Sequence, residues 1–290
     1  MEILVAKRAG FCFGVKRAIN MAFEAADEHQ DGIYTLGPLI HNPQVVERLS
    51  KQGVMPIEDI NAEGIRKLII RSHGVPPRLY EDAINAGCSI IDATCPFVKK
   101  AQNYAKGLRE DGYQVVILGD RRHPEVEGLL GFAGDDAIVL NGQTPIPPLG
   151  KKVGIVVQTT QPIEKLKVLV CDIIERVEEV KVYNTICDSA AMRLEETKDL
   201  AEEVDAVIVV GGKNSANTTQ LANLCRSIGV KTYHIEMASE IESDWFHSAE
   251  RIGITGGAST PNWIIDEVID MLKEIFSGGN INIWSFKGKN

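Results

Sequence analysis

The sequence repeats one pattern three times: an apolar run ends at a cysteine, and an amphipathic stretch follows it. The three runs are EILVAKRAGFC, CSIIDATC and EVKVYNTIC, which place Cys12, Cys95 and Cys187 at separations of 83 and 92 residues. After Cys12, apolar residues at positions 15, 18, 19, 22, 23 and 26 have helical spacing. Alternation of strands and helices predicts an α/β fold with mostly parallel sheets.

Strand-sized apolar runs recur along the whole chain, with amphipathic stretches between most of them. We expect strands at 2–5, 33–36, 68–71, 89–93, 114–118, 137–140, 153–157, 180–184, 205–210, 230–235 and 251–255.

Two further polar positions accompany each cysteine. A strand and a glycine lead to the first one, 28 or 29 residues after the cysteine, in TLGPLIHNP, ILGDRRHPE and VVGGKNSAN: His41, His123 and Ser215. A later strand ends in the second one, shortly before a proline, in RSHGVPP, VQTTQP and GGASTP: His73, Thr159 with Thr160, and Ser259.

This repeat predicts three small parallel-sheet α/β lobes of roughly 90 residues with pseudo-threefold symmetry. We place them at 13–95, 96–186 and 187–275, give the N-terminal strand within 1–12 to the third lobe, and leave 276–290 as a C-terminal tail. All the marked positions follow strands, where ligands of parallel sheets bind, so we expect them to converge on one central cavity.

The three repeated cysteines predict a metal centre with one thiolate from each lobe. Zinc would need a fourth ligand or a water, whereas a cubane iron–sulfur cluster held by three cysteines keeps one iron without a protein ligand. Cysteine spacing leaves both alternatives open. For Cys88, Cys171 and Cys225, which lie outside the repeat, we expect small buried hydrophobes.

The histidines and hydroxyls of the repeat predict a donor-rich pocket for an anion such as phosphate or diphosphate. Each precedes a helix, whose free N–H groups also favour anions. Helix capping alone would explain Ser215 and Ser259, but it explains the histidines poorly.

Glu125 and the two threonines have an ordinary and a functional interpretation. A first-turn glutamate favours the helix dipole, but a carboxyl among neutral or cationic donors is also a candidate proton donor. Thr159 and Thr160 either relay a proton and position a hydroxyl, or cap the helix after Pro162.

Composition and charge argue against several classes of function. The net charge is −9 and no basic block occurs, so nucleic-acid binding has no electrostatic support. Apolar runs such as AVIVV at 206–210 are too short to span a bilayer, and no signal peptide is evident. The scattered cysteines are typical of reduced thiols, so we expect a cytoplasmic enzyme. No dinucleotide or P-loop motif occurs.

Several segments together resemble the IspH/LytB family, the 4-hydroxy-3-methylbut-2-enyl diphosphate reductases. The resemblance covers about 1–275 and rests on GFCFGVKRAI, GPLIHNPQVV, RSHGVPP, DATCPFV, GDRRHPEVEG, QTT, ICDSAAMRLEE, GGKNSANT and GGASTP in this order.

The resemblance implies a [4Fe-4S] cluster held by Cys12, Cys95 and Cys187, with one iron lacking a protein ligand. It implies that Glu125, aided by Thr159 and His123, supplies protons while the allylic hydroxyl leaves as water. The products would be isopentenyl and dimethylallyl diphosphate, at the last step of the non-mevalonate route. The implied electron donor is an external ferredoxin or flavodoxin, and no nucleic acid or membrane is a partner. The expected substrate contacts are His41, His73, His123, Thr159, Thr160, Ser215, Ala216, Asn217 and Ser259.

Two positions depart from the family pattern. Ala216 replaces a common serine, so that it can offer only its backbone N–H, and Phe13 replaces a residue that is small in many members. Two other classes stay open: an iron–sulfur redox sensor, and a zinc-dependent hydrolase of phosphorylated substrates. Metal analysis separates iron from zinc, and turnover of the allylic diphosphate separates an enzyme from a sensor.

Overall fold

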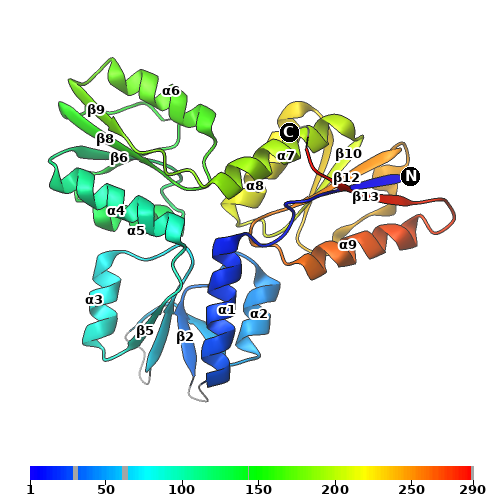
Figure 1. Cartoon of the computed structure of the whole chain (residues 1–290), viewed down its shortest axis with the longest axis horizontal. Helices are drawn as coiled ribbons and strands as arrows, with labels where there is room; N and C mark the ends of the chain where they lie inside the picture. The colour runs from blue at the N-terminus through cyan, green and yellow to red at the C-terminus, as the bar shows by residue number, and fades with distance from the viewer. Residues whose placement is uncertain (29–31, 61–64, 143, 289–290) are drawn as a thin grey trace. The chain divides into compact units, whose positions relative to one another are not determined.

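The structure is a computed structural model that describes residues 1–28, 32–60, 65–142 and 144–288. Its strands form three sheets, here called sheets A, B and C, and within those residues every hydrogen-bonded strand pair is parallel. Helices follow most strands along the chain (Figure 1). The predicted α/β class with three parallel-sheet lobes is confirmed.

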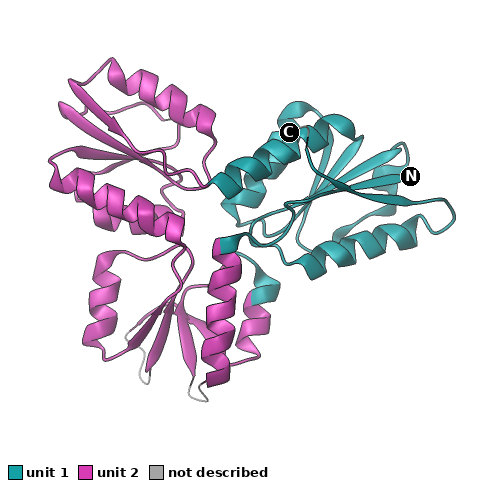
Figure 2. Ribbon diagram, in the orientation of Figure 1, with its two compact units in different colours: residues 1–13, 41–45, 188–290 teal, residues 14–40, 46–187 magenta. Residues whose placement is uncertain are grey.

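The chain separates into two compact units (Figure 2). Unit 1 comprises residues 1–13, 41–45 and 188–290, and unit 2 comprises residues 14–40 and 46–187. Sheet A belongs to unit 1, and sheets B and C belong to unit 2. The lobe boundaries near residues 95 and 187 stay a prediction.

Sheet A has the strand order β11-β10-β12-β1-β13. Strand β1 pairs with β12 on one side and with β13 on the other, so the two ends of the chain share one sheet. The bounds in unit 1 are β1 (Glu2–Ala6), α7 (Asp188–Glu203), β10 (Ala206–Val210), α8 (Ala216–Ile228), β11 (Lys231–Ile235), the 3-10 helices η1 (Ala238–Glu240) and η2 (Ser243–Phe246), β12 (Arg251–Gly256), α9 (Asn262–Ile275) and β13 (Asn282–Phe286).

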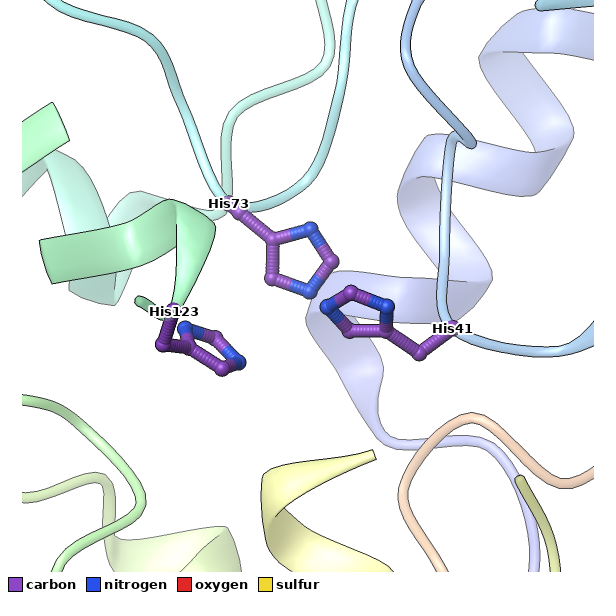
Figure 3. A group of neighbouring side chains, drawn as sticks. All are labelled: His41, His73 and His123. Atoms are coloured by element: carbon purple, nitrogen blue, oxygen red, sulfur yellow. The ribbon is translucent and has the colours of Figure 1, made fainter. Parts of the chain in front are cut away.

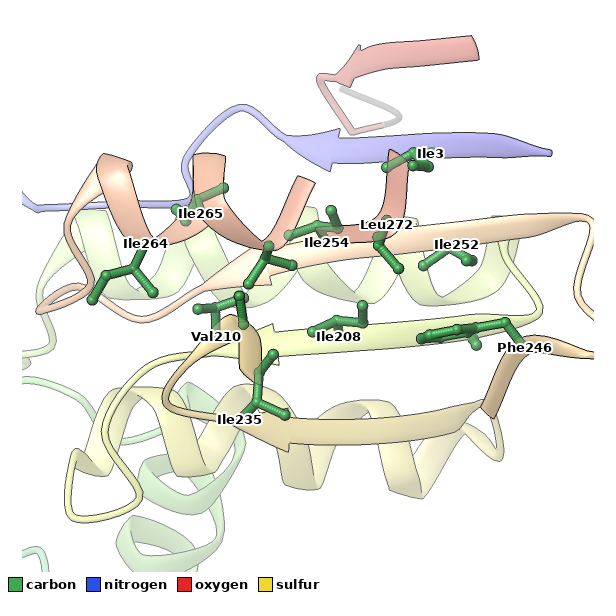
Figure 4. Close-up of a cluster of buried hydrophobic side chains, with 13 residues drawn as sticks. Ile3, Ile208, Val210, Ile235, Phe246, Ile252, Ile254, Ile264, Ile265 and Leu272 are labelled. Atoms are coloured by element: carbon green, nitrogen blue, oxygen red, sulfur yellow. The ribbon is translucent and has the colours of Figure 1, made fainter. Parts of the chain in front are cut away.

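Sheet A is buried on both faces at β10, as the unbroken apolar run of this strand requires. Ile208 and Val210 point to one face, where they join a cluster with Leu272 and other side chains of α9 (Figure 4). Val207 and Val209 point to the other face and pack with apolar residues of α7 and α8. The period of two along the strand therefore fixes which helix each side chain meets.

Unit 2 contains the four-stranded sheets B and C. Sheet B has the order β3-β2-β4-β5, and sheet C has the order β7-β6-β8-β9. The bounds are α1 (Phe13–Glu28), β2 (Ile33–Leu36), α2 (Pro43–Ser50), β3 (Val54–Ile57), β4 (Lys67–Ile70), α3 (Pro77–Asn85), β5 (Ser89–Asp92), α4 (Pro96–Glu110), β6 (Gln114–Leu118), α5 (Pro124–Ala133), β7 (Ile138–Leu140), β8 (Lys152–Val157), α6 (Ile163–Ile174) and β9 (Glu179–Val182). Phe13 and the first residues of α2 are assigned to unit 1.

In sheet C, as in sheet A, successive side chains of a central strand pack against helices on opposite faces of the sheet. Ile117 and Val156 pack with α4 and α5, and Val116 and Ile155 pack with α6. The helices thus hold the carboxyl ends of β6 and β8 in place, and the loops that carry His123 and Thr159 follow these two strands.

Two strands were not predicted from the sequence. Strand β3 contains Pro56, which has no N–H to donate, and it lies at an edge of sheet B, where a strand tolerates this loss. Strand β13 lies at an edge of sheet A with mostly exposed side chains, including Trp284, so it lacks the buried pattern that marks other strands. The predicted strands match observed ones to within two residues at each end.

Among the residues that the structure describes, no helix is both long enough and apolar enough to cross a membrane.

Candidate active site

The three repeated cysteines lie in equivalent places in the three sheets. Cys12 lies between β1 and α1, Cys95 between β5 and α4, and Cys187 between β9 and α7. All three cysteines have intermediate exposure. The strand-to-helix joins predicted from the sequence are therefore present at each cysteine.

Each cysteine also makes the same backbone hydrogen bond. The N–H of Cys12 donates to the carbonyl of Ala258 at 3.0 Å, that of Cys95 to Ser72 at 3.0 Å, and that of Cys187 to Thr159 at 2.8 Å. The accepting loop always follows the neighbouring strand of the same sheet, which is β12, β4 or β8. Because Ala258 and Ser72 precede Ser259 and His73, each cysteine is tied to the loop that bears a second repeated polar residue.

Gly14 makes a close approach to one of these thiols. A Cβ on Gly14 would lie 2.5 Å from Sγ of Cys95, which is closer than any real contact. Two residues further on, the Arg17 guanidinium donates to the carbonyl of Thr94 at 3.3 Å. The first turn of α1 therefore packs directly against the turn that carries Cys95, and a side chain at position 14 would force the Cys95 thiol or α1 to shift.

The other cysteines do not take part in this pattern. Cys88 is buried and donates to the carbonyl of Ile65 at 3.4 Å, and burial raises the pKa of Cys225 to about 12. Cys171 is exposed, so the prediction of a buried hydrophobe is wrong there. The buried face of α6 is formed by Leu166, Leu169 and Ile173, and Cys171 falls outside it.

Glu125 is a buried carboxylate held by one threonine. The backbone N–H of Thr159 donates to Oε1 at 2.6 Å, and the Thr159 hydroxyl donates to Oε2 at 2.9 Å. Burial raises the pKa of Glu125 to about 7, although both hydrogen bonds act to lower it. The carboxyl can therefore hold or release a proton near neutral pH.

His123 lies two residues before Glu125 and caps α5. Its Nδ1 accepts the backbone N–H of Glu125 at 3.1 Å, so the neutral ring carries its proton on Nε2. In unit 2, the His73 ring lies edge-on to the His123 ring, with 5.4 Å between centroids (Figure 3). The capping interpretation, which explained the histidines poorly from sequence, thus holds for His123. His41, also labelled in Figure 3, belongs to unit 1.

The polar residues predicted in unit 1 surround the strand ends of sheet A. Ser215 caps α8 by accepting the Thr218 N–H at 3.4 Å, as expected for a capping serine. Ser259 does not cap α9; its hydroxyl donates to the His41 carbonyl at 3.2 Å. Ala216 is the first residue of α8 and has only its backbone to offer.

Asn217 has a donor that the protein leaves open. Its Oδ1 accepts the Ala258 N–H at 2.9 Å, and the side chain is buried. Its Nδ2 has no hydrogen-bond partner among the described residues. A buried amide donor without a partner is costly, and a bound anion would satisfy it.

The two threonines after β8 do not cap the next helix. The N-cap of α6 is Pro162, with no side-chain hydrogen bond. Thr159 contacts Glu125, and the hydroxyl of Thr160 is buried with no partner in the described part of the chain. The proton or hydroxyl interpretation of Thr159 is therefore the one that agrees with its contacts.

Comparison with known proteins shows the family of this chain. The family model described as LytB protein matches residues 3–273. The chain belongs to the LytB family.

Relatives named 4-hydroxy-3-methylbut-2-enyl diphosphate reductase match this LytB chain over nearly its full length. One from Geobacter sulfurreducens is 52% identical over 276 residues, which are 94% of this chain and 98% of the relative. One from Pelobacter propionicus is 50% identical over 277 residues, which are 95% and 99% of the two chains.

Solved structures are also similar to this LytB chain. A structure of (E)-4-hydroxy-3-methyl-but-2-enyl diphosphate reductase, described as the terminal enzyme of the non-mevalonate pathway, is 44% identical with a TM-score of 0.69, and covers 94% of this chain and 99% of its own. The fold is shared with the E-1-hydroxy-2-methyl-but-2-enyl-4-diphosphate reductase from Plasmodium falciparum, at 24% identity and a TM-score of 0.90, over 100% of this chain and 92% of that chain.

The thiols of this LytB chain fit an iron–sulfur cluster in their chemistry. Three partly exposed cysteines follow strands and precede helices in the same way, and a Cβ on Gly14 would lie 2.5 Å from Sγ of Cys95. Phe13, which departs from the family pattern, is 66% exposed and follows a ligand candidate without replacing it.

The structure also adds residues that the sequence analysis missed. Arg193 and Glu196 of α7 contact the turn before Cys12. Both lie in a segment that resembles the family, but their polar types gave no sign that they would be buried.

Proposed function

We propose that the chain reductively removes the allylic hydroxyl of 4-hydroxy-3-methylbut-2-enyl diphosphate, giving isopentenyl and dimethylallyl diphosphate. In this reaction two electrons and two protons enter, the C–O bond breaks, a C–H bond forms, and the oxygen leaves as water. Full-length relatives with this name support the proposal. The observation that carries it is the buried Glu125–Thr159 pair, whose threonine carbonyl also accepts the Cys187 N–H.

We assign the cofactor to Cys12, Cys95 and Cys187. The family is known to use an iron–sulfur cluster, and we propose the [4Fe-4S] type with one iron that lacks a protein ligand. When bound, such a cluster supplies electrons one at a time and a Lewis-acidic iron for the substrate hydroxyl.

The chain's own residues would bind the diphosphate and hold the substrate still. Histidine, hydroxyl and amide donors favour an anion, and the N-terminus of α8 adds its N–H groups to them. The unpartnered Nδ2 of Asn217 supports this assignment because an anion would satisfy it. The proposed contacts are His41, His73, His123, Thr159, Thr160, Ser215, the N–H of Ala216, Asn217 and Ser259.

Glu125 would hold the proton that leaves with the hydroxyl. With a pKa of about 7, a large share of this carboxyl is protonated at neutral pH, in contrast to an ordinary glutamate. The Thr159 hydroxyl can accept this proton while it donates its own, so it can pass a proton onward. The Nδ1 of His123 accepts the Glu125 N–H, so Nε2 would be the atom through which its neutral ring donates a hydrogen bond.

Two finer assignments belong to this proposal. The family resemblance implies that the electrons would come from an external ferredoxin or flavodoxin. A cytoplasmic location also stays a prediction.

A paired measurement on anaerobically purified protein tests the proposal. Iron, sulfide and zinc contents are measured with the visible spectrum, and turnover of the allylic diphosphate is measured with a chemical reductant. We expect iron, sulfide and both isoprenoid products. Stoichiometric zinc with phosphate release would instead indicate a hydrolase, and a full cluster without turnover would indicate a sensor.

A further inference from the structure

The turn before Cys12 rests on one buried side chain. Arg193, which is 3% exposed, donates from its guanidinium to the carbonyls of Arg8, Gly10 and Gly256. The bonds to Gly10 and Gly256 measure 2.9 and 2.7 Å. Arg8 and Gly10 belong to the segment between β1 and Cys12, and Gly256 ends β12, so Arg193 joins that segment to the neighbouring strand.

The turn needs such support because it has little structure of its own. Residues 7–12 are irregular, and buried backbone carbonyls need a partner. Gly10 has a φ of +113°, and a Cβ there would lie 2.2 Å from Oδ1 of Asn262. The backbone therefore takes a shape that only glycine adopts, and nearby side chains must hold it.

Glu196, one helical turn after Arg193 in α7, also binds the segment before Cys12. It is 2% exposed, and its carboxylate accepts the Arg8 backbone N–H at 2.8 Å and the Arg8 guanidinium at 3.3 Å. Arg193 and Glu196 are three residues apart and thus lie on one face of α7. This face of α7 therefore binds the Arg8 N–H as well as the carbonyls of Arg8 and Gly10.

The turns at the other two cysteines are held differently. Asp92 accepts the Thr94 N–H at 2.9 Å just before Cys95, and Asn184 accepts the Ile186 N–H at 3.2 Å just before Cys187. Each of these turns also has a longer-range side-chain bond: Arg17 donates to the Thr94 carbonyl at 3.3 Å, and the Thr185 hydroxyl accepts the Val157 N–H at 2.8 Å. The segment before Cys12 is longer, and the single side chain of Arg193 binds two of its carbonyls.

We propose that Arg193 is a positioning residue that fixes the backbone leading to Cys12, and thereby the place from which the Cys12 thiolate binds the cluster. It acts through the carbonyls of Arg8 and Gly10 and does not touch substrate. The part of this inference that concerns the cluster rests on the proposed function, whereas its effect on the turn does not.

Amide hydrogen exchange on the full-length holoprotein tests the effect on the turn. The Cys12 and Cys95 N–H groups each donate to a carbonyl at 3.0 Å, so peptides that span Cys95 serve as an internal reference. The substitution Arg193→Met removes all the donors of the guanidinium. We expect the exchange rate of the Cys12 amide to rise about tenfold relative to that of Cys95, because the locally open state of the turn becomes about ten times more populated. Arg193→Lys, which keeps the charge but loses the planar fork, should give an intermediate rise.

Leu200→Ala is the matched control. Leu200 is a fully buried residue of the same helix that packs near Gly253, so its loss destabilises unit 1 without touching the turn. We expect unchanged exchange at Cys12 relative to Cys95 in this variant. An equal rise in Leu200→Ala, or no rise in either Arg193 variant, would overturn the proposal.

The rate at which a chelator bleaches the cluster absorption gives a second readout. It should increase in Arg193→Met and partly recover in Arg193→Lys, at equal starting iron content. If Arg193→Met fails to fold, Arg193→Lys and Glu196→Gln allow the same comparison. Failure of the proposed reaction in the wild-type chain would leave the exchange result readable, so the two failures are distinguishable.

Discussion

The carboxylate of Glu125 accepts two hydrogen bonds from Thr159, one from the backbone N–H at 2.6 Å and one from the hydroxyl at 2.9 Å. The first bond comes from the backbone, so a substitution such as Thr159→Val retains its donor, whereas the second bond depends on the hydroxyl. The pair therefore offers a way to change the Glu125 pKa without removing the carboxyl.

Thr159→Val should raise the pKa of Glu125 further. The hydroxyl stabilises the carboxylate, and a hydrogen bond to a charged group is worth about 1.5 kcal/mol or more, so its loss corresponds to roughly one pKa unit. We expect the alkaline limb of the kcat–pH profile to move up by about one unit, with a lower maximum. Thr159→Ser should retain the wild-type limb, and an unmoved limb in Thr159→Val would contradict the assignment.

Glu125 should also make stability depend on pH. Its folded pKa of about 7 lies above the ordinary value of 4.5, so the folded chain binds this proton more tightly than the unfolded chain. This contribution is complete below pH 4.5 and is lost as pH rises to about 7. The shift amounts to about 3 kcal/mol.

Glu125→Gln removes this dependence. The free energy of unfolding of the variant minus that of wild type should be larger at pH 8 than at pH 5. Denaturant unfolding at the two pH values measures this difference. A constant offset between the two proteins would mean that the Glu125 pKa is not raised.

Gly14→Ala should disturb Cys95. The new Cβ would lie 2.5 Å from Sγ, so the thiol or α1 must move, at a cost of about 1–3 kcal/mol. We expect reduced iron content after reconstitution. Gly107→Ala in α4 is the control: its Cβ meets nothing within 4 Å, and alanine should stabilise the helix by about 0.5–1 kcal/mol. Equal iron content in both variants would contradict the packing argument.

Serine at any of the repeated cysteines should abolish the cluster's visible absorption. Each of Cys12→Ser, Cys95→Ser and Cys187→Ser removes one thiolate of the proposed three. Cys171→Ser is the control because Cys171 is an exposed thiol outside the repeat. A variant that keeps full absorption would exclude that cysteine as a ligand.

Structural features that recur in the three repeats could be predicted from the sequence, whereas features that occur once, such as strand β13 and the contacts of Arg193, were not predicted. The period of the cysteines indicated the strand-to-helix joins, and the same backbone bond occurs at Cys12, Cys95 and Cys187. Strand β13 escaped notice because an exposed edge strand has no buried pattern. Arg193 escaped because its partners are backbone carbonyls far away in sequence, which leave no mark on residue type.

Side-chain roles were harder to predict than positions. Ser259 and His123 occupy the expected places, but the serine donates to a carbonyl and the histidine caps its helix. Whether a polar residue before a helix caps it depends on its rotamer, and sequence does not specify that. The burial of Glu125, which sets its pKa, likewise comes from tertiary packing.

Turnover by Glu125→Gln tests the central claim most directly. Glu127→Gln, an exposed glutamate of the same helical turn, is the matched control, and iron content and substrate affinity are measured for both variants. With a chemical reductant, we predict that Glu125→Gln keeps its cluster and binds the allylic diphosphate but loses about 100-fold or more in kcat, while Glu127→Gln stays near wild type. A kcat within a few-fold of wild type in Glu125→Gln would contradict the account.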